Sequence, residues 1–236
     1  MTLDFQLPTL DDESRRRREA TIGSRVFETI RRAIVQLQFA PGNPLSEAEI
    51  GRQLGVSRQP VREAFIKLSA IGLVEIRPQR GTFVRLISIR EVENARFIRE
   101  AIEVAIVRKA AGDLTPERHA AINSIIEDQR AVAREGDNVA FLRLDEAFHQ
   151  AIARSADCDD AWRVLENLKA QMDRVRYLSL PDATPLETII EQHVWIFEAV
   201  GRHSPGDAEV AMRRHLSEIL KSLPKLAAEF PELFAA

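Results

Sequence analysis

The chain of 236 residues contains one cysteine, few aromatic residues and no long apolar run. Cys158 alone cannot form an intramolecular disulfide, which fits the reducing environment of the cytoplasm. No stretch reaches the roughly 18 apolar residues that a membrane span requires, and the N-terminus has no apolar signal segment. Aromatic residues make up only 6% of the chain, too few to favour a protein that stacks RNA bases. We therefore expect a cytoplasmic protein that does not associate with membranes.

The net charge of −3 does not by itself favour nucleic-acid binding, but the charge is unevenly distributed. Residues 1–91 carry 15 Lys and Arg against 11 Asp and Glu, whereas residues 92–236 carry 18 against 25. The N-terminal part is therefore basic and the C-terminal part acidic. A basic excess is needed to neutralise DNA phosphates, so this distribution places a nucleic-acid-binding function in the first part.

The segment Leu54–Phe65 has the pattern of a turn followed by a DNA-reading helix. Gly55 ends the preceding helical pattern, and Ser57 is expected to accept a hydrogen bond from a free amide of the new helix. Pro60 is tolerated because it falls in the first turn, where amides have no intrahelical partner. Apolar residues then recur at helical spacing and predict a buried face: Val61, Ala64, Phe65, Leu68 and Ile71.

Three polar residues of this helix lie beside that buried face. At about 100° per residue, Arg58, Gln59 and Arg62 share one sector of the helix surface. A helix that is packed on one side and carries two arginines at i and i+4 near its N-terminus suits the major groove of DNA.

The flanking elements complete a winged helix-turn-helix. A first helix runs from Val26 to the Pro41-Gly42 stop, and Ser46 begins a second. After the third helix, β-like runs at 73–77 and 82–86 are joined by a turn that carries Arg80 and Gly81 at its tip. Three helices and a β-hairpin predict a DNA-binding domain over residues 21–87.

Residues 1–20 form an N-terminal arm with little apolar periodicity. Its arginine run, Arg15–Arg18, is either a solvated, frayed segment or an arm that reaches DNA phosphates or a minor groove. At the other side of the domain, residues 88–91 are expected to be a linker.

After Glu91 every segment has a helical pattern, which predicts an all-α domain over residues 92–230. Six helices are expected: 91–112, 116–135, 138–156, 159–179, 185–202 and 205–229. No period of 20 to 50 residues recurs, so the domain is not a repeat array. The fold class is therefore mainly α, a winged helix-turn-helix followed by an all-α helical bundle.

A metal site is one interpretation of the histidines in this domain. Asp145 and His149 are spaced i and i+4, on one face of a helix, while His193 and His215 lie on two later helices. If these faces turn inward, the four side chains can converge on a divalent ion. The alternative for the Asp-His pair is a surface or capping interaction. A set of oxygen and nitrogen donors without thiolate favours Zn²⁺, Ni²⁺ or Mn²⁺.

Over about residues 21–225 the chain resembles the GntR-family transcription regulators, in the FadR-like subgroup with an FCD effector domain. The motifs of the first domain that carry this resemblance are Pro41-Gly42, Leu45-Ser-Glu, Leu54–Ala64, Gly72-Leu and Arg80-Gly81-Thr-Phe-Val84. Those of the second domain are Arg99-Glu-Ala-Ile-Glu103, Asp145, Phe148-His149, His193 and His215.

The resemblance implies roles for individual residues. In DNA binding it implies that Arg58 and Arg62 contact operator bases or adjacent phosphates, with Gln59 nearby, and that the wing at Arg80 and Gly81 contacts the minor groove or backbone. A position that is often a DNA-contacting arginine in relatives is Ala48 here, and Arg52 is an alternative phosphate contact.

In the second domain the resemblance implies that Asp145, His149, His193 and His215 bind a divalent transition metal. It also places Arg99 near an effector cavity, where a guanidinium can bind a carboxylate bidentately; the alternative is an ion pair within the protein. Of Arg174 and Arg176, helix spacing cannot direct both at the cavity, and we prefer Arg176 as the second effector-binding residue.

The function predicted from sequence is a homodimeric regulator, a repressor rather than an enzyme, that binds a palindromic DNA operator. A small organic acid bound at the metal would modulate it. Two alternatives are a regulator for which the metal itself is the signal, and a metal-dependent hydrolase recruited to DNA by the first domain.

Overall fold

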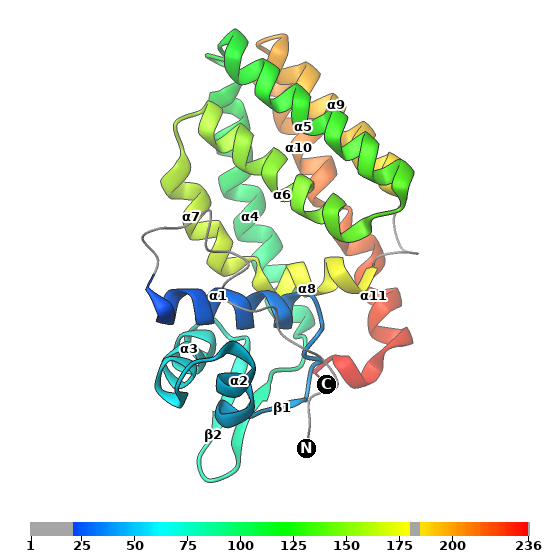
Figure 1. Cartoon of the computed structure of the whole chain (residues 1–236). Helices are drawn as coiled ribbons and strands as arrows, with labels where there is room; N and C mark the ends of the chain where they lie inside the picture. The colour runs from blue at the N-terminus through cyan, green and yellow to red at the C-terminus, as the bar shows by residue number, and fades with distance from the viewer. Residues whose placement is uncertain (1–20, 180–184, 236) are drawn as a thin grey trace. The chain divides into compact units, whose positions relative to one another are not determined.

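The computed structural model describes residues 21–179 and 185–235 (Figure 1). The chain divides into two compact units. The described part of unit 1 comprises residues 21–89 and 230–235, and that of unit 2 comprises the described residues of Arg90–Glu229. The arm predicted at residues 1–20, with Arg15–Arg18, lies outside the described residues.

Three helices begin unit 1: α1 (Ile22–Val35), α2 (Glu47–Leu54) and α3 (Arg58–Ala70). The Ser46 side chain caps α2 by accepting a hydrogen bond from the Glu49 amide. Gly55 ends α2 in the left-handed conformation, with φ of 65°, which glycine adopts at little cost. The chain therefore turns sharply between α2 and α3, as the sequence predicts for a helix-turn-helix.

The core of unit 1 lies mainly between α1 and α3, which pack against each other. Its fully buried side chains recur at helical spacing on both helices, and include Val26, Ile30 and Ile34 of α1 and Val61, Phe65 and Leu68 of α3. Burying apolar side chains contributes about 1.5–3 kcal/mol each, so this contact fixes the side of α3 that remains exposed.

The sheet of unit 1 is the wing. Strands β2 (Val74–Arg77) and β3 (Gly81–Val84) form the expected antiparallel hairpin. A third strand, β1 (Pro44–Leu45), pairs with the other edge of β3, giving the order β1-β3-β2. Because β1 has only two residues, it is too short for an alternating sequence pattern to predict it. Three helices and this sheet confirm the predicted winged helix-turn-helix.

The last described residues also belong to unit 1. After the short 3-10 helix Pro231–Leu233, Phe234 forms a parallel bridge with Ile87. The Ile87 amide donates to the Leu233 carbonyl at 2.9 Å, and the Ala235 amide donates to the Ile87 carbonyl at 2.8 Å. Both apolar side chains of the bridge are buried. The sequence pattern did not predict this pairing, because its two partners are almost 150 residues apart.

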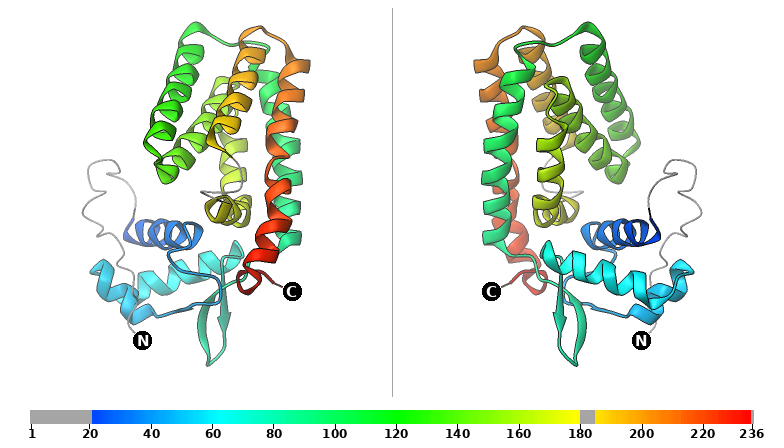
Figure 2. Two further views of the ribbon diagram at one scale, coloured as in Figure 1. Left: turned by 90° about the vertical axis from the view of Figure 1, so that its right-hand side faces the viewer. Right: turned by 90° about the vertical axis from the view of Figure 1, so that its left-hand side faces the viewer.

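Unit 2 is helical throughout its described part, as predicted (Figures 1 and 2). Its elements are α4 (Ile89–Ala110), α5 (Pro116–Glu135), α6 (Asn138–Ser155), α7 (Asp159–Leu168), α8 (Ala170–Ser179), α9 (Leu186–Gly201), α10 (Pro205–Leu216) and α11 (Ile219–Glu229). Since α4 begins at Ile89, the stretch 88–91 that we expected as a linker is helical from its second residue.

Two of the expected helices are each divided. The predicted helix 159–179 is interrupted at Lys169, a buried side chain whose ammonium contacts Asp173 at 2.7 Å and Glu146 at 3.0 Å. The predicted helix 205–229 is interrupted at Ser217 and Glu218. Neither break contains glycine or proline. The local pattern therefore looks continuous, and contacts made in the folded unit set the breaks.

Helices α5, α6, α9 and α10 supply much of the core of unit 2, with α5 against both α6 and α9, and α9 against α10. The largest buried side chains there include Phe141, Phe148 and Trp162. Within the described part of the chain, no helix is long and apolar enough to cross a membrane.

Candidate DNA-binding surface and metal centre

The exposed side of α3 carries the three residues predicted to read DNA. Arg58, Gln59 and Arg62 are exposed, while Val61 and Phe65 are buried against unit 1. Ser57 occupies the N-cap position, but its side chain makes no capping hydrogen bond, so that expectation was wrong. Its backbone is extended, with φ of −67° and ψ of 168°, and the helix starts without side-chain capping.

Carboxylates of the same unit hold two of the predicted arginines. Arg62 Nε and Nη2 donate to Glu47 Oε1 and Oε2 at 2.9 and 2.8 Å, and the Arg62 side chain remains 58% exposed. Arg52 is paired with Glu49 in the same way on α2. The hydrogen bond from Arg62, together with its charge, outweighs partial burial and lowers the pKa of Glu47. Glu47 was not predicted as a site residue, although it belongs to the Leu45-Ser-Glu motif.

The wing presents Arg80 at an exposed turn between β2 and β3. Gly81 follows with φ of 106°, a conformation that a side chain would strain. On α2, Ala48 is exposed beside the same helix-turn-helix and offers no charge. The predicted DNA-binding residues are thus all exposed on unit 1: Arg52, Arg58, Gln59, Arg62, Arg80 and Gly81.

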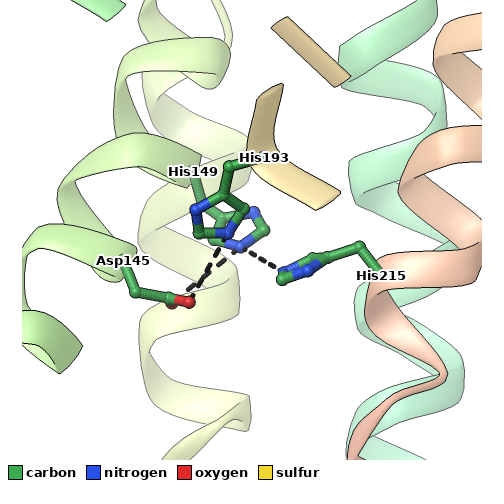
Figure 3. A group of neighbouring side chains, drawn as sticks. All are labelled: Asp145, His149, His193 and His215. Carbon is green, nitrogen blue, oxygen red and sulfur yellow. Dashed lines mark hydrogen bonds and ion pairs between the residues drawn. The ribbon is translucent and has the colours of Figure 1, made fainter. Parts of the chain in front are cut away.

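In unit 2, three helices bring four predicted metal-binding side chains together (Figure 3). Asp145 and His149 lie one turn apart on α6, His193 lies on α9 and His215 on α10. All four are buried, and one ligand atom of each lies within 4.8 Å of the others. The remaining two histidines, His119 and His203, are exposed.

The ligand atoms face one another at distances that suit one ion. His149 Nε2 lies 3.0 Å from His215 Nε2, and His193 Nε2 lies 3.6 Å from Asp145 Oδ1. The last two atoms are buried and have no hydrogen-bond partner among the described residues. Leaving a buried polar atom unsatisfied costs about 1–3 kcal/mol. An ion about 2 Å from each atom would satisfy both, so the residues present fit a divalent metal.

A second layer of side chains orients the imidazoles. The Nδ1 atom of each histidine faces a side-chain oxygen from a different helix. Glu103 Oε2 lies 2.5 Å from His149 Nδ1. Gln129 Oε1 lies 2.9 Å from His193 Nδ1, and Gln192 Oε1 lies 3.0 Å from His215 Nδ1. With Nδ1–H donating to the glutamine oxygens, the Nε2 atoms of His193 and His215 keep their lone pairs for the centre, while His149 Nδ1 and Glu103 form a close ion-pair contact. None of these three residues was predicted to orient a histidine, because glutamine and glutamate are common on helices and only the tertiary packing aligns their oxygens with the imidazoles.

Burial sets the protonation of these ligands. It lowers the pKa of His193 to about 3, and it lowers the pKa of His215 well below its ordinary value, with the neighbouring histidines adding to the effect. Burial alone would raise the pKa of Asp145, but the charges of Arg176 and the histidines outweigh it and hold that pKa well below its usual range. Two neutral imidazoles and an ionised carboxylate are the forms that bind metal.

A cavity of about 70 Å³ lies beside this cluster and is lined by Asp145 and His215. Both predicted effector-binding residues, Arg99 and Arg176, also line it. Arg176, rather than Arg174, is the one directed there, since Arg174 is fully buried and donates to Gln171 at 2.9 Å. The other lining residues are Leu142, Met172, Ser179, Ile189, Leu216, Glu218, Ile219 and Ser222.

Both arginines of the cavity are paired with carboxylates. Arg99 is buried and forms an ion pair with Glu103, one turn along α4. This is the ion pair that we considered as an alternative role, and it coexists with a position on the cavity wall. Burial would raise the pKa of Glu103, but Arg99 and His149 outweigh it and lower that pKa to about 2. Arg176 pairs with Asp145 and lies 3.6 Å from Asp173.

Comparison with known proteins identifies both units. Residues 22–84 match the gntR family of bacterial regulatory proteins, and residues 95–218 match the FCD domain. The chain therefore belongs to the GntR family of transcriptional regulators and carries an FCD domain, as the sequence motifs predicted.

Individual relatives agree with this assignment. The HTH-type transcriptional repressor RspR of Escherichia coli strain K12 is 42% identical over 214 residues, covering 91% of this chain and 94% of that protein. The probable D-xylose utilization operon transcriptional repressor of Paenarthrobacter nicotinovorans is 32% identical over 212 residues, covering 89% and 92%. Both relatives are named as transcriptional repressors, the second as a probable one.

Solved structures share the fold at lower sequence identity. Escherichia coli McbR/YncC matches with a TM-score of 0.77 at 19% identity, over 90% of this chain and all of that one. A GntR-type regulator from Rhodococcus sp. RHA1 matches with a TM-score of 0.68 at 24% identity, over 87% and 97%. At these identities the comparison supports the fold and nothing further.

Proposed function

We propose that this protein is a homodimeric repressor whose binding to a palindromic operator is modulated by a small carboxylate held at a metal centre. The observation that carries the proposal is the shared wall of the cavity, where Asp145 and His215 of the metal cluster lie with Arg99 and Arg176. Two relatives that match along about nine-tenths of this chain are named a repressor and a probable repressor, which supports the direction of regulation.

DNA recognition is assigned to unit 1. Arg58, Gln59 and Arg62 on α3 would read the major groove, because the buried face of the helix leaves that side available. Arg52 would contact phosphate, and the wing at Arg80 and Gly81 would contact the backbone or minor groove. One such helix reads only a few base pairs, whereas a two-fold dimer reads two half-sites.

A surface of unit 2 is suited to a second copy of the chain. Phe97 on α4 and Val210 on α10 are each 68% exposed, which is unusual for large apolar side chains at the centre of a helix. Ion pairs join the same two helices, between Arg108 and Glu209 at 2.6 Å and between Arg213 and Glu100 at 2.5 Å. Exposed large apolar side chains on two helices that also carry paired charges are typical of residues at a protein interface.

The donor set of the cluster supports Zn²⁺, Ni²⁺ or Mn²⁺ as the resident ion. Three imidazole nitrogens and one carboxylate oxygen, with no thiolate, are ligands that these ions share. When bound, the ion would act as a Lewis acid towards an oxygen ligand and tie α6, α9 and α10 together.

Charge in the cavity favours an acidic effector. Arg99 is neutralised by Glu103 and Arg176 by Asp145, so a divalent ion adds two uncompensated positive charges in a buried site. Burying unpaired charge is costly, and an anion relieves that cost. The cavity of about 70 Å³ suits a small effector. Arg99 and Arg176 would bind its carboxylate oxygens.

Operator titration with purified full-length protein tests this function. Fluorescence anisotropy on a labelled operator is measured with metal-loaded protein across a panel of small organic acids. An active acid should change operator affinity by roughly 5–150-fold, and Arg99→Ala should abolish the change. Unchanged affinity across a broad panel would refute the acid-responsive function.

The burial of all four candidate ligands also favours the second candidate, in which the metal itself is the signal. Comparing operator affinity of metal-free and metal-loaded protein without any acid separates the two. A large change on metal loading alone supports a metal sensor, whereas a change that requires both metal and acid supports the leading proposal.

A further inference from the structure

The second layer around the metal cluster continues beyond the glutamines. The side-chain amide of Gln192 donates from Nε2 to Glu218 Oε2 at 3.0 Å, while its oxygen faces His215 Nδ1 at 3.0 Å. Gln192 is buried, and Glu218 lies on the cavity wall between α10 and α11. Glu218 also pairs with the exposed Lys221 at 2.8 Å.

We propose that Glu218 is a positioning residue of the metal centre, acting on His215 through Gln192. This inference rests on the proposed binding of a metal by the cluster. Glu218 is not itself within the four-residue group, and no part of the sequence resemblance marks it.

The physical reason lies in the two ends of an amide. A glutamine side chain has a donor NH₂ and an acceptor oxygen, and the two ends exchange when the amide rotates by about 180°. A carboxylate only accepts, so Glu218 holds the NH₂ end and turns the oxygen towards His215. The His215 Nδ1 must then carry its proton, which leaves the Nε2 lone pair facing the cluster.

Without Glu218, nothing fixes which end of the Gln192 amide faces His215. A rotated Gln192 would present its NH₂ to His215 Nδ1, which then has to accept. The imidazole proton would move to Nε2 and point at the place of the ion. Metal binding would have to rotate the Gln192 amide back and return the His215 proton to Nδ1. The affinity for the metal therefore falls, although all four ligands are present.

Gln129 offers a contrast within the same cluster. Its NH₂ donates to the backbone carbonyl of Leu144 at 3.1 Å, and its oxygen faces His193 Nδ1 at 2.9 Å. A backbone carbonyl cannot be removed by substitution or moved by a ligand in the cavity. Glu218 is therefore the position at which the orientation of a second-layer glutamine depends on a replaceable side chain.

The test measures Zn²⁺ affinity of full-length protein by competition with a chromophoric chelator. Glu218→Ala should bind Zn²⁺ about 10–100-fold more weakly than the wild type. Glu218→Gln should stay within a few-fold of the wild type, because its carbonyl can still accept from Gln192. Lys221→Ala is the matched control; it removes the surface partner of Glu218 and should leave the affinity unchanged.

A double-mutant cycle guards against a general structural effect. Gln192→Leu should weaken Zn²⁺ binding to a similar degree, and adding Glu218→Ala to it should cause little further loss, since both residues act through His215. Circular dichroism of each metal-free variant verifies that it is folded. If Glu218→Ala does not fold, Glu218→Lys takes its place in the cycle: an ammonium can only donate, so it cannot hold the NH₂ end of Gln192 and should weaken Zn²⁺ binding as Glu218→Ala would.

The outcomes are distinguishable. Wild-type affinity in Glu218→Ala, or additive losses in the cycle, would overturn the role of Glu218 while leaving the metal centre in place. Failure of the wild-type protein to bind Zn²⁺, Ni²⁺ or Mn²⁺ would overturn the proposed metal centre and this inference together.

Discussion

Arg62 on the predicted recognition helix is paired with Glu47, which accepts two hydrogen bonds from the Arg62 guanidinium. A base edge or phosphate in a DNA complex would have to replace this carboxylate. We therefore expect Arg62→Ala to weaken specific operator binding by about 1–3 kcal/mol, and Glu47→Ala to leave it unchanged or stronger. Anisotropy titrations on operator and random duplexes measure the affinity of both variants. Equal operator affinity of Arg62→Ala and the wild type would show that Arg62 does not read the bases.

The buried ion pair of Arg99 and Glu103 predicts an asymmetric effect of mutation. Glu103→Ala leaves a buried guanidinium without its partner and should destabilise the protein by about 3–5 kcal/mol in chemical denaturation. Replacing both residues by leucine should recover much of that loss, because no buried charge remains unpaired. An equal or larger loss in the double variant would contradict this account.

Protonation of the buried histidines predicts that the metal-free protein loses stability below neutral pH. His193 has an ordinary pKa of 6.5, which the unfolded chain keeps, but its pKa is about 3 when folded. Between these values only the unfolded state takes up the proton, so the free energy of unfolding falls by about 1.4 kcal/mol per pH unit as pH decreases. The stability is fully present above pH 6.5, and His215 acts in the same direction.

Urea unfolding at pH 7, 6 and 5 in the presence of EDTA measures this loss. A His193→Gln variant, which cannot titrate there, should show a shallower decline. Stability that stays constant between pH 7 and pH 5 in the wild type would contradict the prediction.

Metal binding should stabilise the folded protein and require the buried histidines. At a free Zn²⁺ concentration 100 times the dissociation constant, the gain is about 2.7 kcal/mol relative to EDTA-treated protein. His193→Ala should lose this gain, whereas His119→Ala, an exposed histidine of the same unit, should keep it. Thermal unfolding combined with elemental analysis tests the pair, and equal gains in both variants would place the metal elsewhere.

The exposed side chain of Phe97 predicts the effect of a charge on assembly. If α4 lies at a two-fold interface, Phe97→Glu should shift the protein towards monomer in analytical ultracentrifugation and weaken operator binding. Val164→Glu on α7, at a 54% exposed apolar position, is the matched control and should have no effect on assembly. A dimer that survives Phe97→Glu would exclude this face.

Local patterns were enough to predict the helix-turn-helix. Gly55, the Ser46 cap and the spacing of Val61, Phe65 and Leu68 act within a few residues of one another, so they can be recognised without tertiary information. Breaks inside helices were harder. At the interruption, the Lys169 ammonium pairs with Asp173 and with Glu146, and the second of these partners is on another helix.

The amino-acid sequence by itself determined the two domains, the family, the face of α3 that carries Arg58 and Arg62, and the identities of the four candidate ligands. The tertiary structure decided which oxygen faces each histidine. Glu103, Gln129 and Gln192 are ordinary helical residues until packing places their oxygens within about 3 Å of an imidazole Nδ1. These contacts, two hydrogen bonds and one ion pair, depend on atomic distances between separate helices, and no spacing along one helix specifies them.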